Sequence, residues 1–399
     1  MNNRSETALG IVLTSLLTKN IFFAADAFAP YKRYINVLVT LIVISMFLWR
    51  SKVLLKHHGY AFLIMCYLSI IYILGQLLLF KCNADYFLVD IPRIVLYGVF
   101  PFLIALTVED FDYLMIVLRR SGYMIVGASI VTVAVMYHEG GLQAEYSMSF
   151  GNSVVVGTVI LEHYVLKDRK WFDMALFASG LLCILVGGSR GPFLGVIAYY
   201  ILYLCFISES KTLKLRLEKY AVVLLGLSMF LFYDKILENL YYFLARFGIR
   251  SRALLLFMSG NIGQDSGRSS VYKLCFELLS KHPIKGIGYD GLKALGYTDL
   301  TPHNTYLEFL LYNGIFWGGI LIVILVSVWL LGLVKNRKTS INYLCIVFFS
   351  LYVPRSFIGA GGIEKIDFWM LLAFSIMSIE VFRNRRREEE ELSGIQNLL

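Results

Sequence analysis

Charged residues are scarce in this chain of 399 residues, where they make up 16% of the sequence against 58% hydrophobic residues. A soluble domain carries about 25% charged residues, so this composition excludes an ordinary soluble protein. The apolar residues form runs of the length that crosses a bilayer. The sequence therefore predicts an all-α, polytopic membrane protein.

Metal-ligand spacing and a cleavable leader are also missing. The six cysteines stand singly along the chain, so we interpret them as small apolar residues; they are Cys66, Cys82, Cys183, Cys205, Cys275 and Cys345. The first apolar segment carries Lys19 and Asn20 and has no convincing small-residue cleavage site. A cleavable signal peptide is therefore not expected.

The formal net charge of +9 does not indicate nucleic-acid binding, because the basic residues lie in short clusters between apolar runs. By the positive-inside rule, such clusters mark cytoplasmic loops and place both termini in the cytoplasm. The clusters are Arg50, Lys52 and Lys56; Arg119 and Arg120; Lys167, Arg169 and Lys170; Lys211, Lys214, Arg216 and Lys219; Lys335, Arg337 and Lys338; and Arg383, Arg385, Arg386 and Arg387.

The apolar runs predict about twelve membrane spans. Their approximate ranges are 8–26, 34–49, 60–80, 87–107, 122–137, 151–166, 172–188, 192–207, 219–234, 304–334, 341–359 and 367–382. We therefore expect four parts, namely spans one to nine in 1–234, an extracytoplasmic loop with amphipathic helices in 235–301, spans ten to twelve in 302–383, and a solvated cytoplasmic tail in 384–399.

The long loop lies between the ninth and tenth spans, and long loops are usually functional or disordered. Helical patterns occur at Ile236–Phe257, which could lie in the outer interface or pack structurally, and at Ser269–Leu279. His282-Pro283 and the Gly286-x-Gly288 motif follow. The glycine motif follows no βαβ pattern, so it is weak evidence for phosphate binding, and His282 is interpreted as a turn residue.

The loop ends at Thr301-Pro302-His303-Asn304, before the tenth span. Thr301 is expected as N-cap, with Pro302 at the first helical position and His303 in the first turn. Free backbone N–H groups there favour anions and hold a histidine neutral, so His303 is a candidate general base. It could equally be a polar residue at a helix entrance.

Arginines in apolar runs are functional candidates, since burying them is costly unless they are paired or face water. Arg190, with Ser189 in the glycine-rich GGSRGPF, lies before a helix that Pro192 begins. Arg355 could bind a ligand or reach the membrane surface. Arg93 could bind a ligand or pair with Asp90 on the same turn.

These groups, with Asn152 at the start of the sixth span, are expected at the outer face. Arginines bind phosphate oxygens in a bidentate way, and helix N-termini add backbone donors, so a diphosphate fits them. A histidine beside a diphosphate could remove a proton from an incoming hydroxyl. The pattern indicates glycosyl transfer from a lipid diphosphate.

The segments SGR…KHPIKGIGYDGL…PHNTYLEFLLYNGIFWG, with the earlier GGSRG, resemble the signature of the O-antigen ligase/polymerase superfamily over about 185–320. The resemblance implies a fold similar to the C-type glycosyltransferases, no metal or cofactor, and an undecaprenyl-diphosphate-linked oligosaccharide as donor. Arg190 and Arg268 match the arginines expected to hold the diphosphate, and His303 matches the expected base. Asn304, Tyr306 and Glu308 fall on family positions with supporting roles. Tyr289, Asn152 and Ser189 are further candidate substrate contacts, although GNS at 151–153 departs from the family pattern; Arg355 and Arg93 are added on physical grounds.

The expected protein is a glycosyltransferase of the bacterial plasma membrane that polymerises repeat units into O-antigen or capsular polysaccharide. A polymerase is preferred because the chain shows no appended soluble domain, while a ligase acting on lipid A core or protein is the alternative. A chain-length regulator is a possible partner. A transporter of anionic lipid-linked glycans is the rival class, although no internal repeat is evident.

Overall fold

The computed structural model describes residues 4–80, 83–138, 148–187, 191–207, 238–239, 241–243, 245–246, 268–297, 300–359 and 362–396. These parts of the chain are helical and contain no strand, which confirms the all-helical expectation for them. They form two compact units, which we describe separately. Unit 1 comprises Met1–Val12, Thr40–Met115 and Ser266–Leu399, and unit 2 comprises Leu13–Val39 and Ile116–Asp265.

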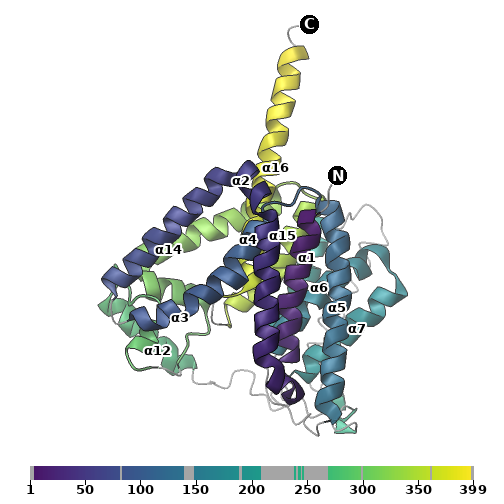
Figure 1. Cartoon of the computed structure of the whole chain (residues 1–399), viewed down its shortest axis with the longest axis horizontal. Coiled ribbons are helices and arrows are strands. Elements are labelled where there is room, and N and C mark those ends of the chain that lie inside the picture. The colour runs from purple at the N-terminus through teal and green to yellow at the C-terminus, as the bar shows by residue number, and fades with distance from the viewer. Residues whose placement is uncertain are drawn as a thin grey trace. The chain divides into compact units, whose positions relative to one another are not determined.

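The described elements follow one another along the chain, and Figure 1 labels most of the helices. They are α1 (Arg4–Phe22), η1 (Asp26–Tyr31), α2 (Lys32–Leu79), α3 (Ala84–Ile94), η3 (Val95–Val99), α4 (Phe100–Ala105), α5 (Phe111–His138), α6 (Met148–Asp168), α7 (Trp171–Val186), α8 (Gly191–Leu202), η4 (Tyr203–Ile207), α12 (Arg268–Lys281), α13 (Gly291–Ala294), α14 (Thr305–Val334), α15 (Ser340–Ser356) and α16 (Ile366–Gln396).

Five described helical stretches are long and apolar enough to cross a membrane, and two more apolar helices are shorter. The five are Asp26–Tyr60, Phe62–Leu79, Ala84–Ala105, Phe111–His138 and Thr305–Val334, and the shorter two are Trp171–Val186 and Gly191–Ile207. These long apolar helices indicate that the chain is a membrane protein. The count of twelve spans stays a prediction, and the expected span at 219–234 lies outside the described residues.

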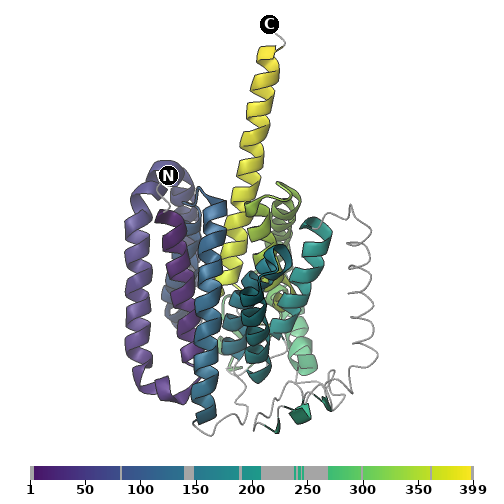
Figure 2. The same cartoon turned by 90° about the vertical axis from the view of Figure 1, so that its right-hand side faces the viewer.

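The core of unit 1 contains the facing sides of α14, α15 and α16. Trp329 of α14 packs edge-on against Tyr352 of α15 with ring centroids 5.5 Å apart, and Phe348 stacks on Phe374 of α16 at 5.4 Å. All four rings are buried. α16 then continues through the arginine cluster to Gln396 and extends beyond its two partners (Figures 1 and 2). The expected boundary at 383/384 therefore lies within one helix.

Helix α14 is broken at Gly314, whose φ of 79° and ψ of 170° lie outside the helical region. The loop before α13 packs into this break. Ile287 and Gly288 donate their backbone N–H groups to the carbonyls of Leu311 (2.8 Å) and Tyr312 (3.1 Å). The glycine motif thus stabilises a kinked helix, since its N–H groups are used by protein carbonyls.

The core of this loop region confirms the expected helix near 269–279, observed as α12. One face of α12 packs on the start of α14 and on the loop between them. The buried members of this cluster are Val271, Cys275, Leu279, Ile287, Leu292, Leu307 and Leu311. Most of the other expected loop helix, at Ile236–Phe257, falls outside the described residues.

Unit 2 is built around α6, which is buried along most of its length. Small residues allow close approach: a Cβ on Gly180 of α7 would lie 2.4 Å from the hydroxyl of Thr158 in α6. Within the unit, His163 Nδ1 on α6 lies 2.6 Å from the hydroxyl of Tyr199 in α8. The helix that Pro192 was expected to begin is α8.

Candidate active site

The entrance of α14 differs from the expected one by three residues. Asn304, not Thr301, is the N-cap, because its extended backbone lets its side-chain oxygen accept from the N–H of Leu307 at 3.1 Å. His303 precedes the helix and has a left-handed φ of 49°. The expectation that His303 sits in the first turn was therefore wrong.

The ring of His303 is half-buried and oriented by its neighbour. The Thr301 hydroxyl and His303 Nε2 are 3.0 Å apart, with either atom able to donate, depending on the ring tautomer. The α15–α16 loop closes over the same entrance, since the Thr305 hydroxyl donates to the carbonyl of Gly359 at 3.3 Å. The local backbone and Thr301 therefore fix the position of the His303 ring at the entrance of α14.

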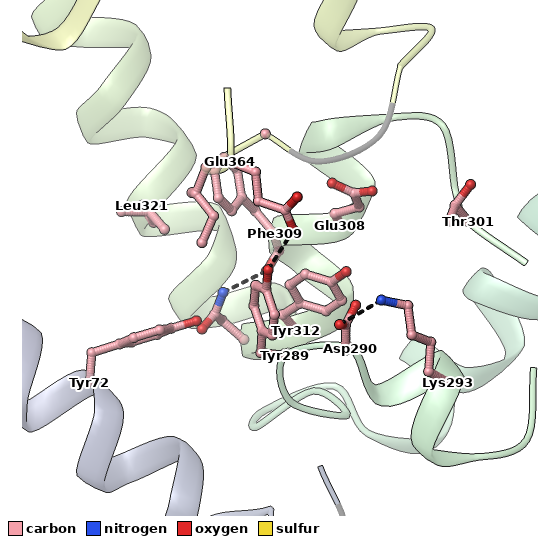
Figure 3. A pocket seen from close by; sticks show the side chains of 13 residues that line it. Tyr72, Tyr289, Asp290, Lys293, Thr301, Glu308, Phe309, Tyr312, Leu321 and Glu364 are labelled. Atoms are coloured by element: carbon pink, nitrogen blue, oxygen red, sulfur yellow. Dashed lines mark hydrogen bonds and ion pairs between the residues drawn. The ribbon is translucent and has the colours of Figure 1, made fainter. Parts of the chain in front are cut away.

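A pocket of about 390 Å³ lies beside this entrance, within unit 1 (Figure 3). Its wall comes from the second half of α2, the loop around α13, α14 on both sides of its break, and the α15–α16 loop. The lining residues are Tyr72, Tyr289, Asp290, Lys293, Thr301, Glu308, Phe309, Tyr312, Asn313, Leu321, Gly362, Ile363 and Glu364. Thr301 joins the pocket wall directly to His303.

Tyr289 is fixed at the pocket wall by hydrogen bonds to three side chains, those of Glu364, Gln76 and Asn83. Its hydroxyl donates to Glu364 Oε1 at 2.8 Å, and its backbone N–H donates to Gln76 Oε1 at 2.9 Å. Asn83 Nδ2 donates to the carbonyls of both Tyr289 (2.9 Å) and Ile287 (2.8 Å). Burial, with the nearby Glu364 charge, raises the pKa of Tyr289, so the phenol stays a hydrogen-bond donor.

Asp290 and Lys293 form an ion pair of 2.7 Å at the pocket edge. Burial raises the pKa of Asp290, opposed by Lys293 and assisted by the side chain of Asp90. Burial works against the charge on Lys293, but the hydrogen bond and charge of Asp290 outweigh it and raise the pKa of Lys293. In Figure 3 this pair, the Tyr312 hydroxyl and the carboxyl group of Glu308 surround one space.

Two of the arginines selected from the sequence are in ion pairs. Arg355 is buried and pairs with Asp367 of α16, so it does not reach the membrane surface. Arg93, with a side chain 55% exposed, pairs with Asp90 at 3.2 Å, as the alternative interpretation expected. Neither guanidinium belongs to the pocket lining.

The remaining selected residues belong to several elements. Tyr306 packs its ring on Phe357 at 4.8 Å, and Asn152 lies in α6 of unit 2. Ser189 and Arg190 lie outside the described residues; Arg268 opens α12, and its side chain is not described. The expected diphosphate clamp therefore stays a prediction.

Sequence reasoning missed most of the pocket wall, including Asp290, Lys293 and Glu364. The first two follow the Tyr289 that the resemblance had marked, so their proximity in sequence was an available signal. Glu364 comes from a separate loop that no motif indicated. Glu308 had been named as a supporting motif residue, and it is 5% exposed.

Comparison with known protein families gives a match for the part of the chain that supplies much of this pocket. Residues 174–322 match the family model described as O-antigen ligase. This part of the chain is similar to the O-antigen ligase family. The O-antigen ligase/polymerase superfamily consists of enzymes of glycosyl transfer on lipid-linked glycans. The match includes His303 and the pocket residues from Tyr289 to Leu321, while searches of curated proteins and of solved structures found no match.

Proposed function

We propose that this protein is a membrane glycosyltransferase that polymerises undecaprenyl-diphosphate-linked oligosaccharide repeat units into a surface polysaccharide. The observation that supports the proposal is the position of His303, held by Thr301 at the wall of a polar pocket, in the region that matches the O-antigen ligase family. Carboxyl, amide and phenol groups in that wall are suited to hydrogen-bonding sugar hydroxyls.

His303 is the general base of the proposed reaction. It takes the proton of an acceptor hydroxyl, whose oxygen attacks the anomeric carbon of the lipid-linked glycan. The new glycosidic C–O bond forms as the bond to the diphosphate breaks, and undecaprenyl diphosphate leaves with its electron pair. Attack opposite the leaving group inverts the anomeric configuration. Because the diphosphate is a competent leaving group, positioning and electrostatic stabilisation are the protein's main contributions.

Arg190 and Arg268 are proposed to stabilise charge that develops on the departing diphosphate, since guanidinium groups bind phosphate oxygens in pairs. The basic clusters support a topology in the bacterial plasma membrane with both termini in the cytoplasm. The donor diphosphate and the pocket then lie towards the outer face. A chain-length regulator remains a proposed partner.

His303→Ala tests the base, with turnover measured on purified protein in nanodiscs. A general base typically contributes about 10²–10⁴-fold, so turnover should fall by at least two orders of magnitude. His282→Ala is the control, because His282 is an exposed histidine in a turn of the same loop. Equal turnover of the two variants would contradict the proposed role of His303.

Arg190→Ala should also cut turnover severely while leaving expression in the membrane intact. Removing one donor that stabilises developing charge typically costs about 10²–10³-fold. Near-normal product from this variant would eliminate the diphosphate clamp.

A ligase is the second candidate, because the matching family model is described as O-antigen ligase. Incubation of the purified protein with one defined lipid-linked repeat unit separates the two functions. A ladder of longer chains indicates a polymerase. Product that appears only after lipid A core or a protein acceptor is added indicates a ligase.

A further inference from the structure

The described lining of the pocket beside His303 carries an excess of negative charge. It contains three carboxylic acids, Asp290, Glu308 and Glu364, and among these described residues the one cation is Lys293, which is paired with Asp290. Glu364 instead accepts from the neutral hydroxyl of Tyr289. The pocket therefore suits a ligand unlike the anionic diphosphate of the donor.

Two charges behind the wall do not reverse this balance. Asp90 interacts with the side chain of Asp290 and adds a further carboxyl group, while its own cation Arg93 is exposed. Lys365 lies close enough to act on Glu308 and Glu364, but burial and the charge of Arg355 lower its pKa and disfavour its charged form. Arg355 is itself paired with Asp367.

The rest of the lining has the chemistry of a carbohydrate subsite. Tyr72, Tyr289, Phe309 and Tyr312 supply aromatic surface on which the apolar face of a sugar ring can pack, and Asn313 supplies an amide. The volume of about 390 Å³ is within the usual range of small-ligand sites. Since His303 is joined to this wall through Thr301, a sugar here would present a hydroxyl near the imidazole.

We propose that this pocket binds the terminal sugar of the acceptor glycan, and that it selects a sugar that is uncharged or carries a free amino group over one that carries a carboxylate, sulfate or phosphate. This proposal rests on the proposed glycosyltransferase function and deepens it. Carboxylates accept hydrogen bonds from hydroxyl and ammonium groups, whereas an acidic sugar would meet like charges in a partly dehydrated space.

The first test is the chemistry of the native substrate. Deletion of the gene should cause a lipid-linked repeat unit to accumulate, and mass spectrometry with linkage analysis identifies its non-reducing terminal sugar. A neutral or amino sugar supports the proposal, and an acidic one overturns it. If no lipid-linked oligosaccharide accumulates, the glycosyltransferase function itself has failed.

The second test measures the pocket directly. The accumulated unit serves as donor, and the free oligosaccharide released from it by mild acid serves as an acceptor that cannot donate. Glu308→Gln and Glu364→Gln should each raise KM for the free acceptor at least tenfold with a smaller change in kcat. KM unchanged in both variants would overturn the acceptor subsite, even if His303→Ala had already established the transferase.

Glu277→Gln is the matched control, because Glu277 lies on the exposed face of α12 and pairs with Lys281 at 2.7 Å. Its KM should equal that of the unchanged protein. Thermal unfolding of each variant in detergent identifies loss of the fold. The KM values of Glu308→Gln and Glu364→Gln are interpreted independently, so one folded variant is enough for the test. Equal rises in KM for Glu277→Gln and the pocket variants would contradict the proposal.

Discussion

The break in α14 gives the sharpest test of how the site is built, through the substitution Gly314→Ala. A Cβ at Gly314 would lie 2.2 Å from the carbonyl oxygen of Ile284 and 2.7 Å from that of Pro283. Both are backbone atoms, so no rotamer change relieves the overlap. Where these two segments meet, the Ile315 N–H also donates a hydrogen bond to the Pro283 carbonyl at 2.7 Å.

Two terms set the cost of Gly314→Ala. Its backbone conformation is essentially restricted to glycine, and holding another residue in such a region costs about 1–3 kcal/mol. Movement of the loop to admit the methyl group breaks a backbone bond, and each group left unsatisfied costs about 1–3 kcal/mol. A combined cost of about 3 kcal/mol makes local opening more frequent by about two orders of magnitude.

Cys275 reports this opening, because its side chain is fully buried in the hydrophobic cluster between α12 and α14, to which Ile287 also belongs. Alkylation of folded protein in nanodiscs, followed residue by residue with mass spectrometry, measures its rate. The rate should rise about a hundredfold in Gly314→Ala. Gly319→Ala is the control in the same helix, since a Cβ at Gly319 meets no atom within 4 Å. Alkylation of Cys275 at the wild-type rate in Gly314→Ala would refute the reasoning.

Three further outcomes follow from the contacts around the site. Arg355→Met should destabilise the protein by about 3–5 kcal/mol, because it leaves Asp367 buried without its partner, and Arg355→Met with Asp367→Leu should recover much of the loss in thermal unfolding. Tyr289→Phe removes the hydroxyl that donates to Glu364, at a cost of about 1–3 kcal/mol. KM for the acceptor should rise, while an unchanged rate of Cys275 alkylation shows that the fold is intact. Lys293→Met should lower stability by less than about 1 kcal/mol at pH 8. Since the pKa of Lys293 is raised in the folded state, its contribution to stability is fully present below its unfolded pKa of about 10.4 and is lost as the pH rises through the folded-state pKa. The unfolding midpoints of Lys293→Met and wild type should therefore converge at that high pH.

The class of the protein and the region of its site could be predicted from local sequence. Long apolar runs indicated membrane helices, and α12 and α8 form where their patterns and Pro192 predicted. The motif around His303 also identified the family. At the entrance of α14, however, the sequence predicted Thr301 as the cap, whereas the left-handed backbone of His303 excludes that start and the helix is capped by Asn304.

Long-range contacts account for what sequence reasoning could not find. The partner of the Gly286-x-Gly288 motif is the kink at Gly314, and neither glycine identifies the other in a single sequence. Ion pairing was predictable only within a turn, as for Arg93 with Asp90. The pairing of Arg355 with Asp367 depends on how two helices pack.

The kink also explains why a polar pocket can exist beside a membrane helix. Breaking α14 leaves the carbonyls of Leu311 and Tyr312 without their helical partners, and non-helical backbone at membrane depth is tolerated only where protein or water satisfies it. The loop supplies these donors from Ile287 and Gly288. The next residue in that loop is Tyr289, so the bonds that satisfy the kink also deliver the phenol to the pocket. Variants of the kink should therefore affect stability and acceptor binding together, whereas variants of the carboxyl groups should separate them.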